Sequence, residues 1–392
     1  MYKIDYMTNV GQHHMTVTHP HYQAIYNYLP DNINFNLCNY QSNINSSWHD
    51  YLIRIGTKAK ELGATEKDIE FFISKIHPNC KYQEQSNLYF VPTHPYFGSE
   101  PHIINLEHWM SHYTYLVEQF VSIGKEVPID DIGWQKVVLA TMLEENFKYI
   151  CSHMHDTIDT FKFLTRDYPE LQNKFVYLPL ASQEADKEIK HKSFDKPLKI
   201  LFTNSFGGQL GNFRIRGGYE AYEAIKKVLH CDIHFTTIGP APQFTHEKVV
   251  QYPHVDYETF QKLIDESHIL LLPAMRVHTI SLVKAMCNGI IPIVSDGWGF
   301  NEFIDNEYNG IIVDGHNGIT TWKDKNNIFQ EDGTKSANPI IIENIYNVLV
   351  SLINDINSVE ILSNNCIEFA KRNFKLEHRN NILLEMIQNA CA

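Results

Sequence analysis

The feature that most constrains the fold is an alternation of short apolar runs and helical stretches over residues 198–315. The runs LKILFTN, IHFTTIG, ILLLPA and IIPIVSD are apolar almost throughout, which is typical of strands buried on both faces of a parallel sheet. Between the first two lies YEAYEAIKKVLH, whose apolar residues recur at helical spacing. This order predicts an α/β domain with a doubly wound parallel sheet.

The first half of the chain shows the same alternation less clearly. INFNLCN, NLYFVPTHP, HIINLEHW and FKYICSH are the main strand candidates there. A length of 392 residues accommodates two domains, and the polar segment 181–197 is typical of a linker. We therefore expect domains at residues 1–193 and 194–370, followed by a helical tail over 371–392. Residues 315–339 are expected to form an irregular insertion loop.

Composition excludes several classes of protein. The net charge is −13, from 33 basic and 46 acidic residues, so nucleic acid is not an expected partner. Seven cysteines without a C-x-x-C pair favour a reducing compartment and argue against a disulfide framework. The chain shows no secretory signal pattern at its start and no apolar run long enough for a transmembrane segment, so we expect a cytoplasmic protein.

The loop that follows LKILFTN is the first candidate binding site. It reads SFGGQLGNFRIRGG, with five glycines and two arginines directly before a predicted helix. Glycines allow close approach of a ligand, guanidinium groups match phosphate oxygens, and a helix N-terminus attracts anions. We expect a diphosphate site here, formed by Arg214, Arg216, Gly217 and Gly218, with Asn204 as a further donor-binding residue. The alternative is a flexible loop with solvated arginines.

A second candidate anion site follows ILLLPA, where the chain reads MRVHTISLVKAMCNG. Thr279 or Ser281 is expected to cap the helix that begins here, with Arg276 and His278 just before it. The helix start would then present N–H groups to an anion. Ordinary N-capping with surface charges is the alternative.

Two further positions complete the donor site in this interpretation. Glu302, in GWGFNEF after IIPIVSD, is expected at the start of a helix, where its carboxylate would accept sugar hydroxyls. A first-turn acid favoured by the helix dipole is the alternative. Gly239 follows IHFTTIG, and the nucleotide base is expected near residues 239–242.

The stretch 198–315 resembles the nucleotide-sugar domain of the group 1 glycosyltransferases (glycosyltransferase family 4). The most specific part is SLVKAMCNGIIPIVSDGWGFNEFI followed by NEYNGIIV. The resemblance implies the GT-B fold, an α/β architecture of two doubly wound Rossmann-like domains facing a central cleft. It implies that the last helix crosses back to the first domain. It also implies a hexosyltransferase-like enzyme with a UDP- or GDP-linked donor and retention of anomeric configuration.

The chain departs from the family at two positions. The family carries two glutamates eight residues apart, and these positions are Arg276 and Lys284 here. The resemblance assigns the first glutamate to the donor sugar and the second to the ribose hydroxyls. Either the donor is bound differently, or the chain is a divergent branch, or activity is lost. We expect the Lys284 amine, one helical turn from the cap, to reach a phosphate.

The first domain supplies the candidate catalytic residues. Glu107 and His108 follow the predicted strand HIINL, and the resemblance implies that a histidine or carboxylate of this domain contacts the transferred sugar or the acceptor. His108 is the first choice and Glu107 the second, with His112 one turn further along. The alternatives are a core histidine and a helix cap. Asn9 and Gly11 are expected in a loop that approaches the donor or acceptor.

Metal chemistry is not expected. His153 and His155 form an H-x-H, but two ligands without a partner cluster do not make a metal site. No apolar-flanked D-x-D occurs. The sequence thus predicts a metal-independent glycosyltransferase without a cofactor.

The acceptor is not legible in the sequence and could be a glycan, a lipid-linked glycan, a protein or a modified base. Two alternatives to a glycosyltransferase stay open. One is a catalytically impaired sugar-nucleotide-binding or scaffold protein, favoured by the two cations that replace glutamates. The other is a sugar-nucleotide epimerase of the same fold, which would need more carboxylates than the candidate site shows.

Overall fold

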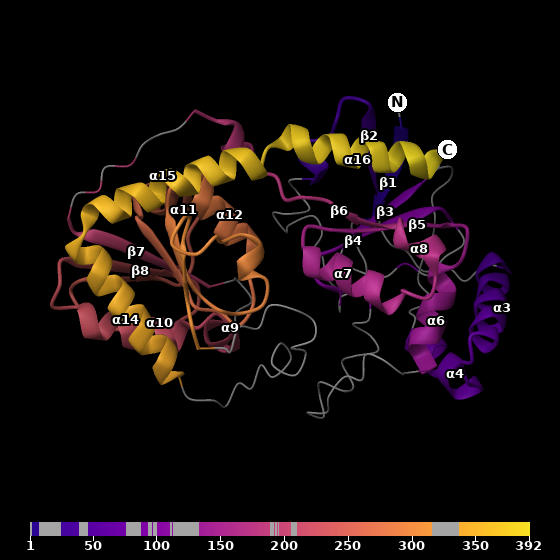
Figure 1. The fold of residues 1–392 in the computed structure, drawn as a ribbon, viewed down its shortest axis with the longest axis horizontal. Helices are drawn as coiled ribbons and strands as arrows, with labels where there is room; N and C mark the ends of the chain where they lie inside the picture. The colour runs from indigo at the N-terminus through magenta and orange to yellow at the C-terminus, as the bar shows by residue number, and fades with distance from the viewer. Residues whose placement is uncertain are drawn as a thin grey trace. The chain divides into compact units, whose positions relative to one another are not determined.

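The computed structural model describes residues 2–7, 25–38, 46–75, 88–92, 96, 100–109, 112, 133–188, 192, 194, 196–204, 210–315 and 337–392. The chain divides into two compact units (Figure 1). Unit 1 comprises Met1–Leu180 with Glu377–Ala392, and unit 2 comprises Ala181–Leu376. The sequence placed these boundaries after residues 193 and 370.

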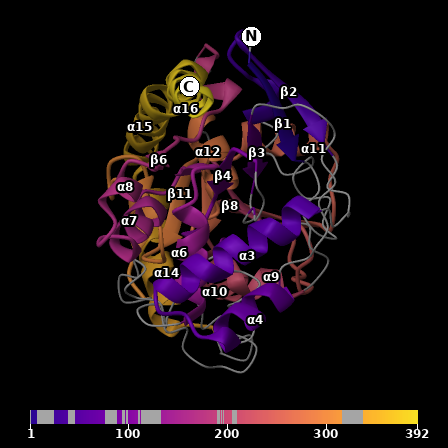
Figure 2. The ribbon, with the colours of Figure 1, turned by 90° about the vertical axis from the view of Figure 1, so that its right-hand side faces the viewer.

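Unit 1 contains a parallel sheet of six strands in the order β2-β1-β3-β4-β5-β6. Their bounds agree with the apolar runs of the first half: β1 Tyr2–Met7, β2 Ile33–Cys38, β3 Tyr89–Pro92, β4 His102–Leu106, β5 Phe147–Ser152 and β6 Phe175–Tyr177. The helices of this unit are α3 Ser46–Glu61, α4 Glu66–Lys75, α6 Gly133–Met142, α7 His155–Leu164 and α8 Pro169–Gln172, together with α16 Leu376–Cys391. Helices α3 and α4 contact α6 (Figure 2).

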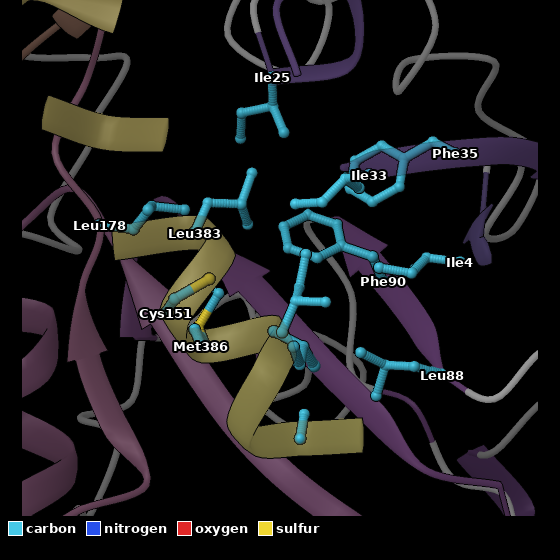
Figure 3. Packing of buried hydrophobic residues seen from close by; sticks show 13 residues of the cluster. Ile4, Ile25, Ile33, Phe35, Leu88, Phe90, Cys151, Leu178, Leu383 and Met386 are labelled. Carbon is cyan, nitrogen blue, oxygen red and sulfur yellow. The ribbon is translucent and has the colours of Figure 1, made fainter. Parts of the chain in front are cut away.

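The last helix, α16, is part of the core of unit 1. Its Leu383 and Met386 lie among the side chains of Ile4, Phe35 and Phe90 from the sheet (Figure 3). These side chains are almost fully buried, and each contributes about 1.5–3 kcal/mol when removed from water. The C-terminal segment is therefore held to unit 1 by apolar packing.

Unit 2 contains a second parallel sheet of six strands, in the order β12-β11-β10-β7-β8-β9. The strands are β7 Leu198–Thr203, β8 Ile233–Ile238, β9 Val249–Tyr252, β10 Ile269–Leu272, β11 Ile291–Ser295 and β12 Ile311–Val313. The helices are α9 Leu210–Ile215, α10 Gly218–Val228, α11 Tyr257–Glu266, α12 Thr279–Cys287, α14 Pro339–Asn354 and α15 Ile356–Asn373, with short 3₁₀ turns η2 Gln183–Asp186 and η3 Phe300–Glu302. The predicted doubly wound parallel sheet is confirmed.

The strand order of unit 2 places a switch point at its centre. From β7 the chain runs outward through β8 and β9 on one side, and then returns to the other side of β7 for β10, β11 and β12. Ligands of open α/β sheets bind at the carboxyl ends of the strands where the order reverses. That point lies between β7 and β10.

The helical tail predicted over residues 371–392 corresponds to the end of α15 and to α16. Helix α14, which precedes them, is bounded by Asn338 and Asp355. Residues 316–336 of the expected insertion loop lie outside the described residues. Among the described helices, none has by itself the length and hydropathy of a membrane span. Helix α14 and the segment Ile356–Cys391 meet those criteria only together, with a bend of 105° between them.

Candidate functional site

The carboxyl ends of β7, β10 and β11 carry the candidate site of unit 2. Asn204 directly follows β7, residues 273–278 follow β10, and residues 296–299 follow β11. Because neighbouring strands lie only about 5 Å apart, the segments that leave them start side by side. The site is therefore set by the topology of the sheet.

The segments after β10 and β11 are locked together by backbone hydrogen bonds. Val277 N donates to Trp298 O at 2.8 Å, and Trp298 N donates to Met275 O at 2.8 Å, so that Arg276 and Trp298 form an isolated bridge. This pairing continues the sheet by one step beyond the strands. It holds the backbone of Arg276 in place.

The turn between α9 and α10 packs against the segment after β10, and two glycines make this possible. Gly217 has a φ of +71°, and a Cβ atom there would lie 2.0 Å from the carbonyl oxygen of Pro273. A Cβ atom on Gly218 would lie 2.5 Å from the ring of Phe213. Only glycine fits such contacts. The packing brings Arg216, which directly precedes Gly217, beside the segment that carries Arg276.

Arg216 and Arg276, which we call the arginine pair, lie close enough for their charges to interact. Burial is the main cause that lowers the pKa of Arg216 to about 10, and the charge of Arg276 adds to it. Within the described residues, the Arg216 side chain forms no hydrogen bond and no ion pair. A largely buried guanidinium beside a second one is unfavourable unless an anion compensates it.

Helix α12 starts directly after the arginine pair, and its first turn has no side-chain cap. The N-cap residue is His278, whose side chain makes no capping hydrogen bond. The expectation that Thr279 or Ser281 caps this helix is therefore wrong, because both residues already belong to its first turn. The N–H groups of that turn have no intrahelical acceptor. They add a partial positive charge beside the arginine pair.

Asn204 and Gly239 form the neighbouring part of this edge. The Asn204 backbone N donates to Ile238 O, and its Nδ2 donates to Pro240 O, both at 2.7 Å. Gly239 has a φ of +102°, and a Cβ atom on it would lie 2.7 Å from the Asn204 carbonyl oxygen. The Asn204 Oδ1 is buried and accepts no hydrogen bond from the described residues. This acceptor lies at the end of β7, one strand from the arginine pair.

Two predicted donor-site cations lie apart from the arginine pair. The Arg214 guanidinium stacks on the ring of Tyr219 at 4.9 Å from its centroid. The Lys284 Nζ lies 5.0 Å from the ring of Tyr257 and 4.7 Å from that of Phe260, both on α11. The two side chains are thus engaged by aromatic residues of unit 2.

Glu302 also differs from its expected setting. It is the last residue of the 3₁₀ turn η3, which follows Gly299 at a φ of +81°. Glu302 does lie in the first turn of a helical segment, but this segment is a single 3₁₀ turn that ends at Glu302. The residue is partly exposed.

In unit 1, Glu107 and His108 lie directly after β4, at its carboxyl end, as the sequence suggested. The Glu107 carbonyl accepts hydrogen bonds from Ser152 Oγ at 3.5 Å and from Thr157 Oγ1 at 3.3 Å. The His108 ring lies 5.6 Å from that of the buried Trp109. The structure thus holds both candidates at the carboxyl edge of a parallel sheet.

The other histidines singled out from the sequence are buried or stacked. Burial lowers the pKa of His112 to about 3, so its imidazole is neutral. His153 is buried directly after β5, and His155 stacks on Tyr177 at 3.7 Å. Across the described ranges, no group of three histidine, cysteine or acidic side chains is placed to hold a metal ion.

Asn9 and Gly11 of the expected loop lie outside the described residues.

Arg276 is more central to the candidate site in the structure than the sequence indicated. The sequence marked it mainly as a departure from the family, whereas the structure makes it the charged neighbour of Arg216. Its position in the segment that follows a buried strand was the available signal.

Comparison with known proteins places this geometry in a fold. No protein-family model matches the sequence, and no curated protein matches it. The structure of HepE from Anabaena with UDP and glucose has a TM-score of 0.57 and 10% identity, and the match covers 99% of this chain and 100% of HepE. Sucrose-phosphate synthase from Thermosynechococcus elongatus has a TM-score of 0.57 and 10% identity, covering 99% and 98% of the two chains.

A glycosyltransferase from Rickettsia africae is similar too, with a TM-score of 0.55, 11% identity and coverage of 99% and 98%. This chain has the GT-B fold. Its two parallel sheets are the two Rossmann-like domains of that fold. The predicted GT-B architecture is confirmed at this level. In GT-B terms, the arginine pair lies on the C-terminal Rossmann-like domain.

Proposed function

We propose that this GT-B protein is a glycosyltransferase that moves a sugar from a UDP- or GDP-linked donor to an acceptor. The proposal rests on one observation, the largely buried Arg216 beside Arg276 at the switch point of unit 2. HepE, which shares the fold, has been solved with UDP and with UDP-glucose. Transfer with retention and without a metal ion is part of the proposal.

A diphosphate suits the arginine pair electrostatically. Guanidinium groups donate two parallel hydrogen bonds to phosphate oxygens and keep their charge at any physiological pH. Two negative charges placed beside Arg216 and Arg276 would offset the repulsion between them. The uncapped N–H groups of α12 would supply further donors. Asn204, at the adjacent strand end, offers an acceptor to the nucleoside.

The same groups would assist the transfer. When the bond between the sugar and the diphosphate breaks, its electron pair stays on the diphosphate and the negative charge there increases. Cations and amides that are already in place stabilise this charge without reorganisation. His108 and Glu107 are the proposed catalytic residues of unit 1. The proposed donor-binding set is Asn204, Arg216, Gly217, Gly218, Gly239, His278, Thr279 and Ser281, with Glu302 as a further candidate. We leave Arg214 and Lys284 out of this proposed set because their cationic groups lie against aromatic rings.

A second candidate function is sugar-nucleotide binding without transfer. Its support is the pair of cations, Arg276 and Lys284, at the positions where the resemblance expects glutamates. The Lys284 ammonium lies against aromatic rings. As a cation, it cannot accept hydrogen bonds from ribose hydroxyls as the glutamate expected at this position would. Such a protein would bind the donor and release no sugar.

Calorimetric titration with UDP, GDP and their hexose conjugates tests the proposal, using Arg216→Ala and the matched control Arg214→Ala. We expect Arg216→Ala to weaken nucleotide binding at least tenfold, because a hydrogen bond to a charged group contributes about 1.5–3 kcal/mol. Arg214→Ala should change affinity by less than about threefold, since its guanidinium stacks on Tyr219. Unchanged affinity in Arg216→Ala would reject the diphosphate site.

Nucleotide release from each bound sugar donor, with and without a mixture of acceptors, then separates the functions. Release of nucleotide with transfer of the sugar supports the glycosyltransferase. Tight binding without release indicates the binding protein, and a donor recovered as its epimer indicates the epimerase.

A further inference from the structure

His278 lies half-buried in the candidate site. It lies directly before α12, and its side chain does not cap that helix. Its Nε2 is buried and has no hydrogen-bond partner among the described residues. Buried polar atoms of native proteins are almost always paired, so an unpaired imidazole nitrogen beside an anion site indicates a ligand as its partner.

Two positive charges lie near enough to this imidazole to lower its pKa. Arg216 approaches from the turn between α9 and α10, and Arg276 lies two residues upstream on the segment after β10. No acidic side chain of the described residues contributes to the balance at His278. Burial and the two guanidiniums hold the pKa of His278 well below its usual 6.5. The imidazole is therefore neutral while the site holds no anion.

An anion bound in the site would favour the protonated form of His278 over the neutral form. The charges of a bound diphosphate offset those of Arg216 and Arg276, and a phosphate oxygen accepts the hydrogen bond that Nε2 can donate. Both effects favour the protonated ring. The imidazole that is neutral in the free protein would therefore be protonated in the complex.

We propose that His278 binds the nucleoside diphosphate as an imidazolium and takes up the required proton from solvent when the nucleotide binds. This inference rests on the proposed function, because it assigns a role within the same diphosphate site. His278 then acts as a third cation, added only when the ligand is present.

The third cation should interact differently with the intact sugar nucleotide and with the diphosphate that remains after the sugar is transferred. A sugar nucleotide carries one negative charge on each phosphate, which the arginine pair balances. Once the sugar has left, the terminal phosphate carries further negative charge, since its second pKa is about 6. An imidazolium therefore stabilises the leaving diphosphate more than the intact donor. Interactions that strengthen along the reaction in this way raise the rate.

Proton uptake can be measured directly. Binding of UDP-glucose and of UDP is followed by calorimetry from pH 6 to pH 8 in buffers of different ionisation enthalpy. We expect the wild type to take up as much as about one proton per nucleotide, and its affinity to fall by up to about tenfold per pH unit as pH rises. UDP-glucose has no phosphate that titrates in this range, so its uptake belongs to the protein. UDP should bind more tightly than UDP-glucose at pH 7.

The variant His278→Gln keeps a hydrogen-bond donor but cannot be charged, and His234→Gln replaces an exposed histidine of β8 as the control. The proposal expects His278→Gln to lose the uptake and the pH dependence, while His234→Gln retains both. Binding by the wild type without proton uptake, or uptake that persists in His278→Gln, would overturn the assignment and leave the proposed function standing. If the wild type binds neither UDP nor GDP, the proposed function itself fails.

Discussion

Substitution of Arg216 tests the proposed diphosphate site, because the charge of this residue should destabilise the free protein and strengthen the binding of UDP. The side chain is largely buried beside Arg276 and lacks an ion pair among the described residues. Arg216→Gln removes the charge and keeps a polar, shorter side chain. We expect the free variant to be more stable than the wild type and to bind UDP more weakly.

The magnitude follows from the electrostatics. The fall in the pKa of Arg216 from 12.5 to about 10 corresponds to roughly 3 kcal/mol of penalty on the charged form, at 1.36 kcal/mol per pKa unit. Residual exposure and the packing lost with the longer side chain reduce the net gain to about 1 kcal/mol. For a domain of the size of unit 2, this raises Tm by roughly 2–4 °C.

Differential scanning calorimetry with and without UDP measures both effects. At a UDP concentration one hundred times its Kd, the wild type gains about 2.7 kcal/mol of stability. A tenfold weaker variant gains only about 1.4 kcal/mol at the same concentration, so its UDP-induced shift in Tm should be about half as large. Arg214→Gln, which loses only the stacking on Tyr219, should keep the full shift.

The opposite pattern would refute the reasoning. A free Arg216→Gln protein that melts at a lower temperature, and that UDP stabilises as strongly as the wild type, would mean that Arg216 is a structural cation. Arg216 would then have a counter-charge in the folded protein, and the diphosphate site would lie elsewhere.

Two further substitutions test the geometry around the arginine pair. Gly217→Ala should destabilise the protein by about 1–3 kcal/mol in thermal unfolding, because its Cβ would lie 2.0 Å from the Pro273 carbonyl oxygen at a φ of +71°. The control Gly56→Ala should not destabilise it, since the nearest atom to its Cβ would be 3.7 Å away. Equal effects of the two substitutions would contradict this packing. Lys284→Met should cost at most about 1 kcal/mol of stability through the lost contacts with Tyr257 and Phe260, and should leave UDP affinity within about threefold in calorimetry. A tenfold loss of affinity in Lys284→Met would show that the amine reaches the nucleotide after all.

The sheets could be predicted from local sequence because buried parallel strands carry their own signature. Runs such as LKILFT and ILLL are apolar on both faces and are bounded by turn residues, and both became strands, β7 and β10. The pairing of β7 with β10, which creates the switch point, joins residues about seventy positions apart. Apolar periodicity contains no information about which strand pairs with which.

The sequence located the candidate site but did not show which role each of its residues has. Arg214 and Arg216 are two residues apart in RIRGG and look equivalent in the sequence. In the structure, the first guanidinium stacks on Tyr219, and the second lies near the charge of Arg276 from the segment after β10. The start of α12 was also placed one or three residues too late, because Thr279 and Ser281 are both good caps wherever a helix begins after them.

Local sequence by itself determined the α/β class, the buried strands, the glycine-rich turns and the concentration of cations after two strands. These depend on side-chain polarity and backbone freedom over a few residues, which neighbours along the chain already decide. Tertiary structure alone decided that Arg216 lies near Arg276, that Asn204 lies one strand away, and that the half-buried His278 lies near both positive charges. The physical reason is that burial and electrostatic interaction depend on distance through space, and the order of strands in a sheet sets that distance.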